Sequence, residues 1–487
     1  MQVQTDKKSW FWTSQALSHA LVCAILLLFF AGYFIDLEQE ISLVAFLLFS
    51  ITTFILVLRY KQLLLYAISF LVPLSVQVSV AGNARVSLPV EMMCVLLSIF
   101  LFVQLVLGKR PDRGFLKHPI TAFILLDLTW LFFSSLLSEM PEVSLKRVTI
   151  RLFYYATFYY FFFELFKLSA ANIRRVFILY TAGFLVPIVY AMIKHYQLGF
   201  TTMGSQQISA PFYFDHTIYG ACLVFFIPFL IHAVSDRSYR LIRRAALFIL
   251  PVFICAAYFS YSRAAWISIL AAMGVYVVLK YKIPKKWLLY AGLIVIAGIL
   301  INVKRIDQVL KQNKDISHTN NIGMHFKSIS NVNTDASNKE RINRWKCALR
   351  MFADKPLAGF GPGTYQFFYG AYQQRSDLTR ISTFNGTKGH AHSEYLNYLS
   401  ETGLPGLLIF LSLSGVVFYT ALRAFRRATE KETKDVLLFL ITGLITFYIH
   451  AFFNGFLEFD KMAMPVFCAF AAIISLDLKH RESSRAL

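Results

Sequence analysis

Long apolar stretches alternate with short polar ones over most of the chain. Each apolar stretch is about twenty residues long, the length of a helix that crosses a hydrocarbon core of roughly 30 Å. The pattern predicts an all-α, polytopic integral membrane protein with about fourteen transmembrane helices, whose ends carry an error of about two to four residues. The predicted spans are 16–35, 41–58, 62–80, 88–107, 119–137, 152–168, 174–193, 217–234, 243–262, 264–281, 286–302, 404–422, 436–455 and 461–477.

One large polar segment, residues 303–403, interrupts the apolar pattern. It divides the chain into residues 1–302 with the first eleven helices, the loop itself, and residues 404–487 with the last three helices and a tail. The first part of the loop is rich in Asn, Ser and Lys, and its pattern assigns no role to residues 311–336. A loop of this length is uncommon unless it is functional or disordered.

The second part of the loop predicts an amphipathic helix over residues 337–354. Ser337 followed by Glu340 has the spacing of a capping box. Four apolar residues then recur at helical spacing. They are Ile342, Trp345, Leu349 and Phe352. We expect this face to lie on the protein or at the membrane surface.

The charge distribution predicts the topology. The chain is 57% hydrophobic and 15% charged, with a formal net charge of +21. Its Lys and Arg residues concentrate in alternate loops, for example at 109–117, 237–244 and 423–434, whereas "DLEQE" at 36–40 has none. This positive-inside pattern predicts that both termini are cytoplasmic and that the large loop lies outside the cytoplasm. The basicity is therefore topological and does not indicate nucleic-acid binding.

The segment "GHAHSEYLNYLSETGLPG" carries several ionisable groups directly before an apolar run. We expect His392 to begin a short helix that Gly403 ends and Pro405 restarts, which places His392 near the membrane surface. Three interpretations remain open. In the first, His390 and His392 are hydrogen-bonded interfacial residues. In the second, they bind a metal together with Glu394, although the spacing matches no standard zinc motif. In the third, His392 is a general base, because its near-neutral pKa suits proton abstraction.

Arg263 is a second unusual residue, in the sequence "SYSRAAW" between two spans with almost no loop. A charge at such a place is costly unless it is paired or faces a wet cavity, so it is a functional candidate. The alternative is an interfacial arginine whose side chain extends to the lipid headgroups. The predicted topology puts Arg263 and His392 on the same face.

These segments together resemble the O-antigen ligase and polymerase superfamily. His392, Ser393, Gly403 and Gly406 fit the ligase pattern His-[Asn/Ser/Gln], nine residues, Gly, two residues, [Gly/Thr/Tyr]. The stretch "RINRWKCALRMFADKPLAGFGPGTYQ" looks like the one that precedes this histidine in the family, with Arg341 at the place of the loop arginine. "SYSRAAW" and, before it, "FYFDHTIYGACL" are also similar. The resemblance runs in order from about 210 to 420.

The resemblance implies transfer of a glycan from undecaprenyl pyrophosphate to an acceptor hydroxyl, at the periplasmic face of the bacterial inner membrane, without metal, nucleotide or other cofactor. By this resemblance Arg263 and Arg341 hold the pyrophosphate and His392 deprotonates the acceptor. We also expect Glu394 to contact substrate. Apart from membrane lipids, the expected partners are the lipid-linked donor and a glycan or protein acceptor, with no nucleic acid.

The acceptor stays open among three classes. Lipid A-core would make the protein an O-antigen ligase, which we favour; a growing glycan would make it an O-antigen polymerase; a protein Ser or Thr would make it an O-oligosaccharyltransferase. A flippase for lipid-linked glycans is the alternative from another class. A transporter needs polar residues along a central path, whereas the unusual residues here gather at one face, and this favours an enzyme.

Overall fold

A computed structural model of the protein describes residues 59–80, 84–200, 208–284, 336–379 and 389–485, with isolated positions between them. Eight of its helices are long and apolar enough to cross a membrane, which confirms the all-α, polytopic fold class. They are α6 (Pro119–Leu136), α9 (Ala171–Gln197), α11 (His216–Ser235), α12 (Arg240–Phe259), α13 (Arg263–Lys280), α18 (Glu394–Arg427), α19 (Lys431–His450) and α20 (Asp460–Arg485). The predicted spans 16–35, 286–302 and most of 41–58 lie outside the described residues.

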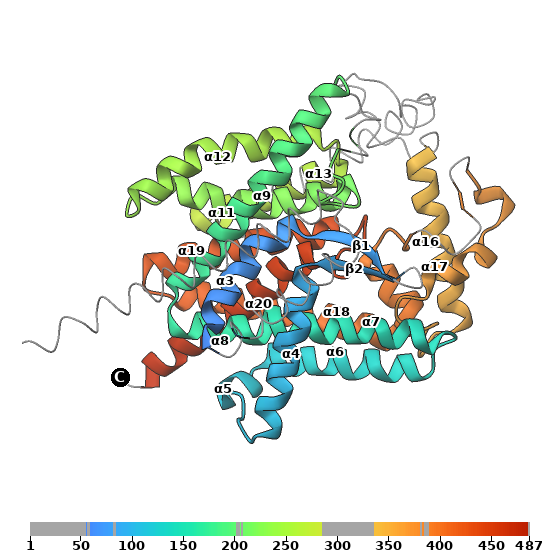
Figure 1. The fold of residues 1–487 in the computed structure, drawn as a ribbon, viewed down its shortest axis with the longest axis horizontal. Coiled ribbons are helices and arrows are strands. Elements are labelled where there is room, and N and C mark those ends of the chain that lie inside the picture. The colour runs from blue at the N-terminus through green and yellow to red at the C-terminus, as the bar shows by residue number, and fades with distance from the viewer. Residues whose placement is uncertain are drawn as a thin grey trace, which may run out of the picture.

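Helices α11 and α20 form the centre of the bundle. Both are almost entirely buried, and α11 packs against α12, α13 and α19. In Figure 1, α20 lies in the middle, α9, α12 and α13 lie on one side of it, and α6, α7 and α18 lie on the other. A helix that is apolar all round suits such a position, because it meets other helices on every side.

The predicted span 62–80 is wrong. The chain forms a short helix, α3 (Lys61–Leu71), and a 3-10 turn at Val72–Leu74 that contains Pro73. A hairpin follows, in which β1 (Val76–Val80) pairs antiparallel with β2 (Ala84–Leu88). Residues 76–80 read "VQVSV", and this period of two is typical of a strand. Total hydropathy hides that period, because three of the five residues are valine.

Two further predicted spans differ in length from the helices observed. Span 88–107 is the helix α4 (Val90–Val106), which is shorter than the other membrane helices. Span 152–168 is only the second half of a longer helical segment. This segment consists of α7 (Pro141–Tyr154), a π-helical turn at Tyr155–Phe161 and α8 (Phe162–Leu168). Its first half carries charged residues, which lowered the hydropathy there.

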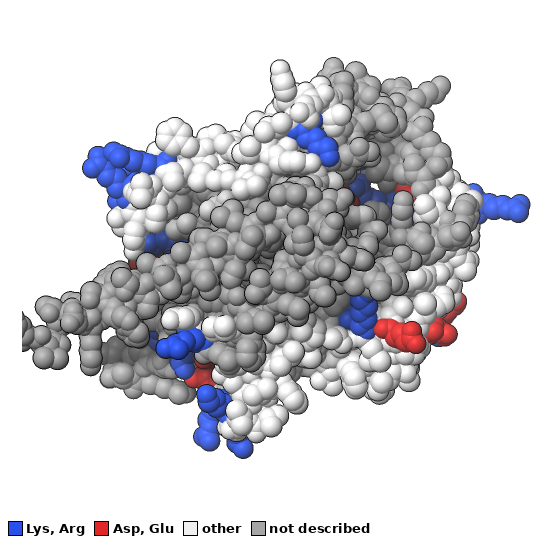
Figure 2. All heavy atoms as spheres, viewed as in Figure 1, with Lys and Arg blue, Asp and Glu red and all other residues white. Residues whose placement is uncertain are grey.

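Loops that were predicted to share the cytoplasmic side meet at one end of the molecule. Lys167 pairs with Asp112, and Arg174 pairs with Glu432 at 2.7 Å and with Asp236 at 3.6 Å. Several of the Lys and Arg side chains visible in Figure 2 gather at its left-hand end. The contacts agree with the predicted alternation of loops. Which end faces the cytoplasm stays a prediction.

The predicted helix of the large loop is present as α16 (Ala336–Asp354), which packs against α18. Its predicted apolar face is only partly buried, since Leu349 is 50% exposed and Ile342, Trp345 and Phe352 are half-buried. The buried face consists of Glu340, Asn343, Arg344, Cys347, Ala348 and Met351. The capping box is also wrong: the helix begins before Ser337, and Glu340 pairs with Arg344 at 3.0 Å. Hydropathy does not predict this buried face, because the face includes the charged pair of Glu340 and Arg344.

The expected break in α18 is present at Gly403, whose φ is +70°. The loop after α16 packs its backbone against this break. Leu404 N–H donates to Pro356 O at 2.8 Å, and Gly361 N–H donates to Glu401 O at 2.8 Å. A Cβ on Gly403 would lie 2.1 Å from Leu357 O. Only glycine fits this contact, because both the backbone angle and the space exclude a side chain.

Replacement of Gly403 tests this contact. Gly403→Ala should destabilise the protein by about 2 kcal/mol or more, because it adds both strain and a clash with a backbone oxygen. Gly415→Ala is the matched control, since Gly415 lies in the same helix and a Cβ there meets nothing within 4 Å. The melting temperature in detergent measures the effect. Equal melting temperatures for the two variants would contradict the proposed packing.

Candidate active site

His392 was expected to begin the helix but lies in the turn immediately before α18. The helix begins at Glu394, and Ser393 is its N-cap, whose Oγ accepts from Leu396 N–H at 3.4 Å. His392 itself has a φ of +49°, in the left-handed region. This conformation costs a non-glycine residue about 1–3 kcal/mol and persists only where its surroundings hold it.

Hydrogen bonds hold the backbone around His392 from several sides. His392 N–H donates to His390 Nδ1 at 3.0 Å, and the His392 carbonyl accepts from Trp345 Nε1 at 3.2 Å. The preceding residue, Ala391, donates its N–H to Asn397 Oδ1 at 2.8 Å. The strained turn is therefore held by α16, by His390 and by the first turn of α18.

The His392 ring contacts Asn454, which comes from the loop between α19 and α20. The distance from His392 Nδ1 to Asn454 Oδ1 is 3.0 Å, and Asn454 is only 1% exposed. An amide oxygen only accepts, so Nδ1 carries the proton. The lone pair of the ring is then on Nε2, and this nitrogen is the one that can take a proton from a substrate.

The surroundings keep His392 neutral. Burial lowers its pKa well below the ordinary value, and the neighbouring His390, Arg341 and Arg344 lower it further, whereas the bond to Asn454 raises it. Burial also lowers the pKa of His390. The near-neutral pKa expected for His392 is therefore wrong, but a neutral imidazole near pH 7 is still able to accept a proton.

Helix α16 brings two arginines to this turn. The charge of Arg341 acts on His392, and Trp345, four residues further along the helix, contacts the His392 carbonyl. Arg344, which the sequence analysis missed, is buried and donates from Nη1 to His390 O at 3.2 Å. Its guanidinium also lies over the Tyr369 ring, 4.8 Å from the centroid. Arg341 thus lies near His392 as expected.

Arg263 is the first residue of α13 and lies at the same end of the molecule. The turn before it packs on α11, since a Cβ on Gly220 would lie 2.9 Å from Ser262 Cβ. The residue that caps α11, Asp215, lies close enough for its charge to act on His390. The expected shared face of Arg263 and His392 agrees with these contacts. Their joint action with Arg341 on one group stays a prediction.

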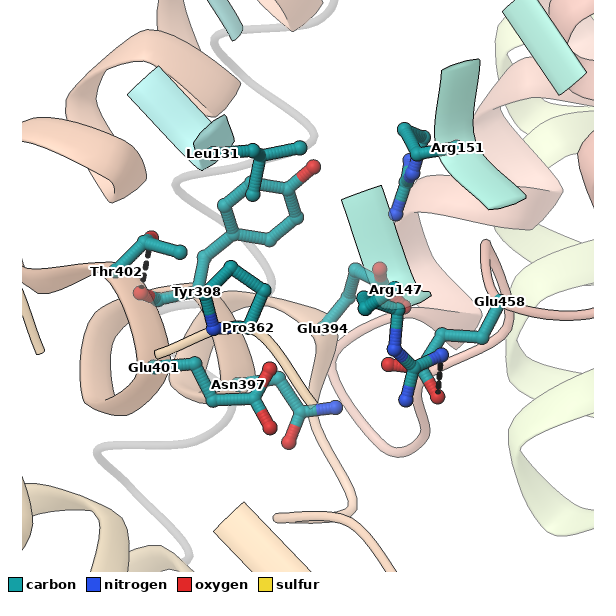
Figure 3. Close-up of a pocket in the computed structure, with 10 residues that line it drawn as sticks. All are labelled: Leu131, Arg147, Arg151, Pro362, Glu394, Asn397, Tyr398, Glu401, Thr402 and Glu458. Carbon is teal, nitrogen blue, oxygen red and sulfur yellow. Dashed lines mark hydrogen bonds and ion pairs between the residues drawn. The ribbon is translucent and has the colours of Figure 1, made fainter. Parts of the chain in front are cut away.

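Glu394 holds the neighbouring loop in place. Its Oε2 accepts from Phe456 N–H at 2.7 Å, and its own N–H donates to Ala451 O at 2.8 Å. The carboxylate also lines a small pocket behind the histidine turn, shown in Figure 3. Glu394 therefore has a structural role, and its expected contact with substrate stays a prediction. Within the described ranges, no group of three or more His, Cys, Asp or Glu residues is arranged to hold a metal ion.

Comparison with known proteins adds a family to this geometry. Residues 245–411 match the family model described as O-antigen ligase. Over these residues the chain is similar to the O-antigen ligase family. The match covers about a third of the chain, includes Arg263, Arg341 and His392, and confirms the resemblance seen in the motifs. No curated protein matches the chain.

Each position of the motif shared with O-antigen ligases has a structural role in this fold. His392 lies in the strained turn, Ser393 caps the helix, and Gly403 forms the break. Gly406 packs where a Cβ would lie 1.9 Å from Thr402 Oγ1. Asn454 lies outside both the motif and the matched residues. The only signal for it in the sequence is the polar turn "FNGFLEFD" between the last two spans.

Proposed function

We propose that the protein is an O-antigen ligase that transfers a glycan from undecaprenyl pyrophosphate to a hydroxyl of lipid A-core. The observation that carries the proposal is the half-buried His392, whose Nδ1 is bonded to Asn454 Oδ1 at 3.0 Å and whose lowered pKa keeps the ring neutral. The match to the O-antigen ligase family supports transfer of a glycan from a lipid-linked donor to a glycan acceptor.

In the proposed reaction the acceptor oxygen attacks the anomeric carbon of the donor glycan. The bond from that carbon to the pyrophosphate oxygen breaks, and His392 Nε2 takes the proton of the acceptor hydroxyl. The leaving group, undecaprenyl pyrophosphate, gains negative charge in the transition state. Guanidinium groups suit planar, multidentate phosphate recognition, and Arg263 and Arg341 would supply them.

The proposal includes a location. The protein would be a multi-pass protein of the bacterial inner membrane, with both termini in the cytoplasm and residues 303–403 in the periplasm. The eight apolar helices support a multi-pass membrane protein. The donor lipid would reach the site from the membrane and the acceptor from its outer face, which suits a base at the end of a helix bundle.

A deletion strain tests both the base and the acceptor. The strain should accumulate lipid-linked polymer and expose bare core, and the wild-type gene should restore the attached polymer. His392→Ala should insert at normal levels and restore none, because a positioned base contributes about 10²–10⁴ in rate. Core that carries a single repeat would indicate a polymerase instead. Normal attachment by His392→Ala would exclude the general-base role.

Asn454 gives a pH test. In Asn454→Asp a carboxylate next to Nδ1 raises the pKa of His392, so the ring stays protonated to a higher pH. Because only the neutral ring accepts a proton, the acid limb of the transfer rate should move to higher pH, with activity recovered above it. Asn454→Ala should lower the rate without that upward shift. Rates measured across pH with purified lipid-linked donor distinguish these outcomes.

A matched control for Asn454 lies elsewhere in the bundle. Asn172 is equally buried and accepts from Tyr66 Oη at 2.9 Å. Asn172→Asp should leave the pH profile in place. An unmoved profile for Asn454→Asp, in protein that folds normally, would contradict the proposed tautomer.

The arginine pair is tested by lysine replacement. Lysine keeps the charge but loses the fork of donors, so Arg263→Lys and Arg341→Lys should each lose most of the activity. Since both arginines act on one group, the loss of activity in the double Ala variant should be smaller than the product of the losses in the two single Ala variants. Arg350→Lys is the control, because Arg350 lies on α16 but pairs with Asp377 at 2.8 Å. Transfer measured with chelator present also tests for a metal requirement. Full activity of both Lys variants would contradict the clamp.

A further inference from the structure

A small polar pocket lies directly behind the histidine turn. Figure 3 shows its walls: α6 contributes Leu131, α7 contributes Arg147 and Arg151, and the first turns of α18 contribute most of the remainder. Pro362 and Glu458 close it from two loops. The free space inside is about 20 Å³, which is room for about one water molecule or one hydroxyl-bearing group.

Arg151 is the side chain in this pocket that most needs a ligand. It is only 6% exposed, and its Nη1 has no hydrogen-bond partner in the part of the chain that the structure describes. Figure 3 shows its guanidinium directed toward the interior of the pocket. A buried donor without a partner is destabilising by about 1–3 kcal/mol, and more when it is charged. A group that accepts a hydrogen bond inside the pocket would remove this penalty.

The other charged side chains of the pocket restrict what that group is. Arg147 Nη1 already pairs with Glu458 at 2.5 Å. Glu401 accepts the N–H groups of Gly363 at 2.9 Å and Tyr365 at 3.0 Å. With two arginines against three glutamates, the formal charge of the lining is −1, which disfavours an anion. An arginine donor opposite carboxylate acceptors suits a neutral group that both accepts and donates, and a hydroxyl does both.

The pocket adjoins the histidine turn that carries the proposed base. Asn397 lines the pocket, and its Oδ1 accepts the N–H of Ala391, the residue before His392, at 2.8 Å. A Cβ on Gly455 would lie 2.7 Å from Asn397 Nδ2, 3.2 Å from Glu394 Oε2 and 3.8 Å from His390 Cγ. Side chains of the pocket and of the histidine turn therefore converge on one point.

We propose that this pocket binds a hydroxyl or hydroxymethyl group of the acceptor saccharide. The proposal rests on the proposed glycan transfer and adds the acceptor subsite to it. One hydroxyl of a neutral sugar bonds to Arg151 and the facing carboxylates, and another hydroxyl of the same sugar is presented to His392. A sugar that carries a phosphate or carboxylate at the anchored position is disfavoured by the formal charge of the lining.

A pocket-filling variant tests the subsite. Leu131→Phe narrows the pocket at its apolar wall, and it should raise the acceptor KM tenfold or more while the donor KM stays unchanged. Leu125→Phe is the control, because Leu125 lies on the same helix but is 50% exposed, and it should change neither constant. Arg151→Lys is the second variant and should also raise the acceptor KM alone. An unchanged acceptor KM in whichever of these two variants folds would overturn the subsite.

Binding without transfer separates this proposal from the proposed function. Trp130 Nε1 donates to the carbonyl of Thr402, a pocket residue, at 2.9 Å, so its fluorescence reports on the pocket. Methyl glycosides of glucose, galactose and mannose are the probes. At least one should change the fluorescence of the wild type but not of Leu131→Phe or Trp130→Phe, and glucuronate should act more weakly. Response to none of the three would overturn the subsite. Binding in a protein that never transfers glycan would instead overturn the proposed function.

Discussion

The contact between the broken helix α18 and the loop that follows α16 is the constraint on which the site depends. Two backbones approach so closely at Gly403 that no side chain fits between them. Glu401, two residues before the break, accepts two N–H groups of the same loop. This contact fixes the direction of the first turns of α18. Since His392 directly precedes those turns, the position of the proposed base depends on a glycine eleven residues away.

The two ends of the bundle compensate buried charge with different partners. At the end predicted to be cytoplasmic, Arg174 is also buried, and it pairs with Asp236 and with the half-exposed Glu432, so that neighbouring loops are linked. Such pairs join elements and contribute little free energy where solvent screens them. At the other end, Arg344, Glu394 and Glu401 are nearly fully buried. A buried charge is tolerated only where several hydrogen bonds compensate it, and the loops there provide backbone N–H groups for that purpose.

Much of the fold could be predicted from the sequence, because membrane spans depend on length and total hydropathy. The helix α16 and the break at Gly403 were also predictable, since helical spacing and the Gly-Leu-Pro sequence are local signals. The hairpin at Val76–Leu88 was not, because the three valines of β1 keep the total hydropathy of residues 76–80 high and so hide the alternation. The inner face of α16 was not either, because the pairing of Glu340 with Arg344 makes two charged residues suitable for burial.

The residues of the candidate site were likewise predictable only in part. His392, Arg263 and Arg341 were found because each is unusual for its neighbourhood or fits a motif. Asn454 was missed because its role depends on a contact with His392, a residue 62 positions earlier in the sequence. Arg151 was missed because an arginine at the start of an apolar run reads as an interfacial residue. Only the packing of α7 against α6, α4 and α20 turns it inward, toward the pocket.

The loop that supplies Asn454 has a consequence for how the protein is made. It follows α19, so it leaves the ribosome after the histidine turn and α18 have been synthesised. Until this loop is in place, the His392 ring lacks the Asn454 contact that fixes its tautomer, and the Glu394 carboxylate lacks the Phe456 N–H that it accepts. The proposed base is therefore oriented only when α19 and the loop after it dock on α18.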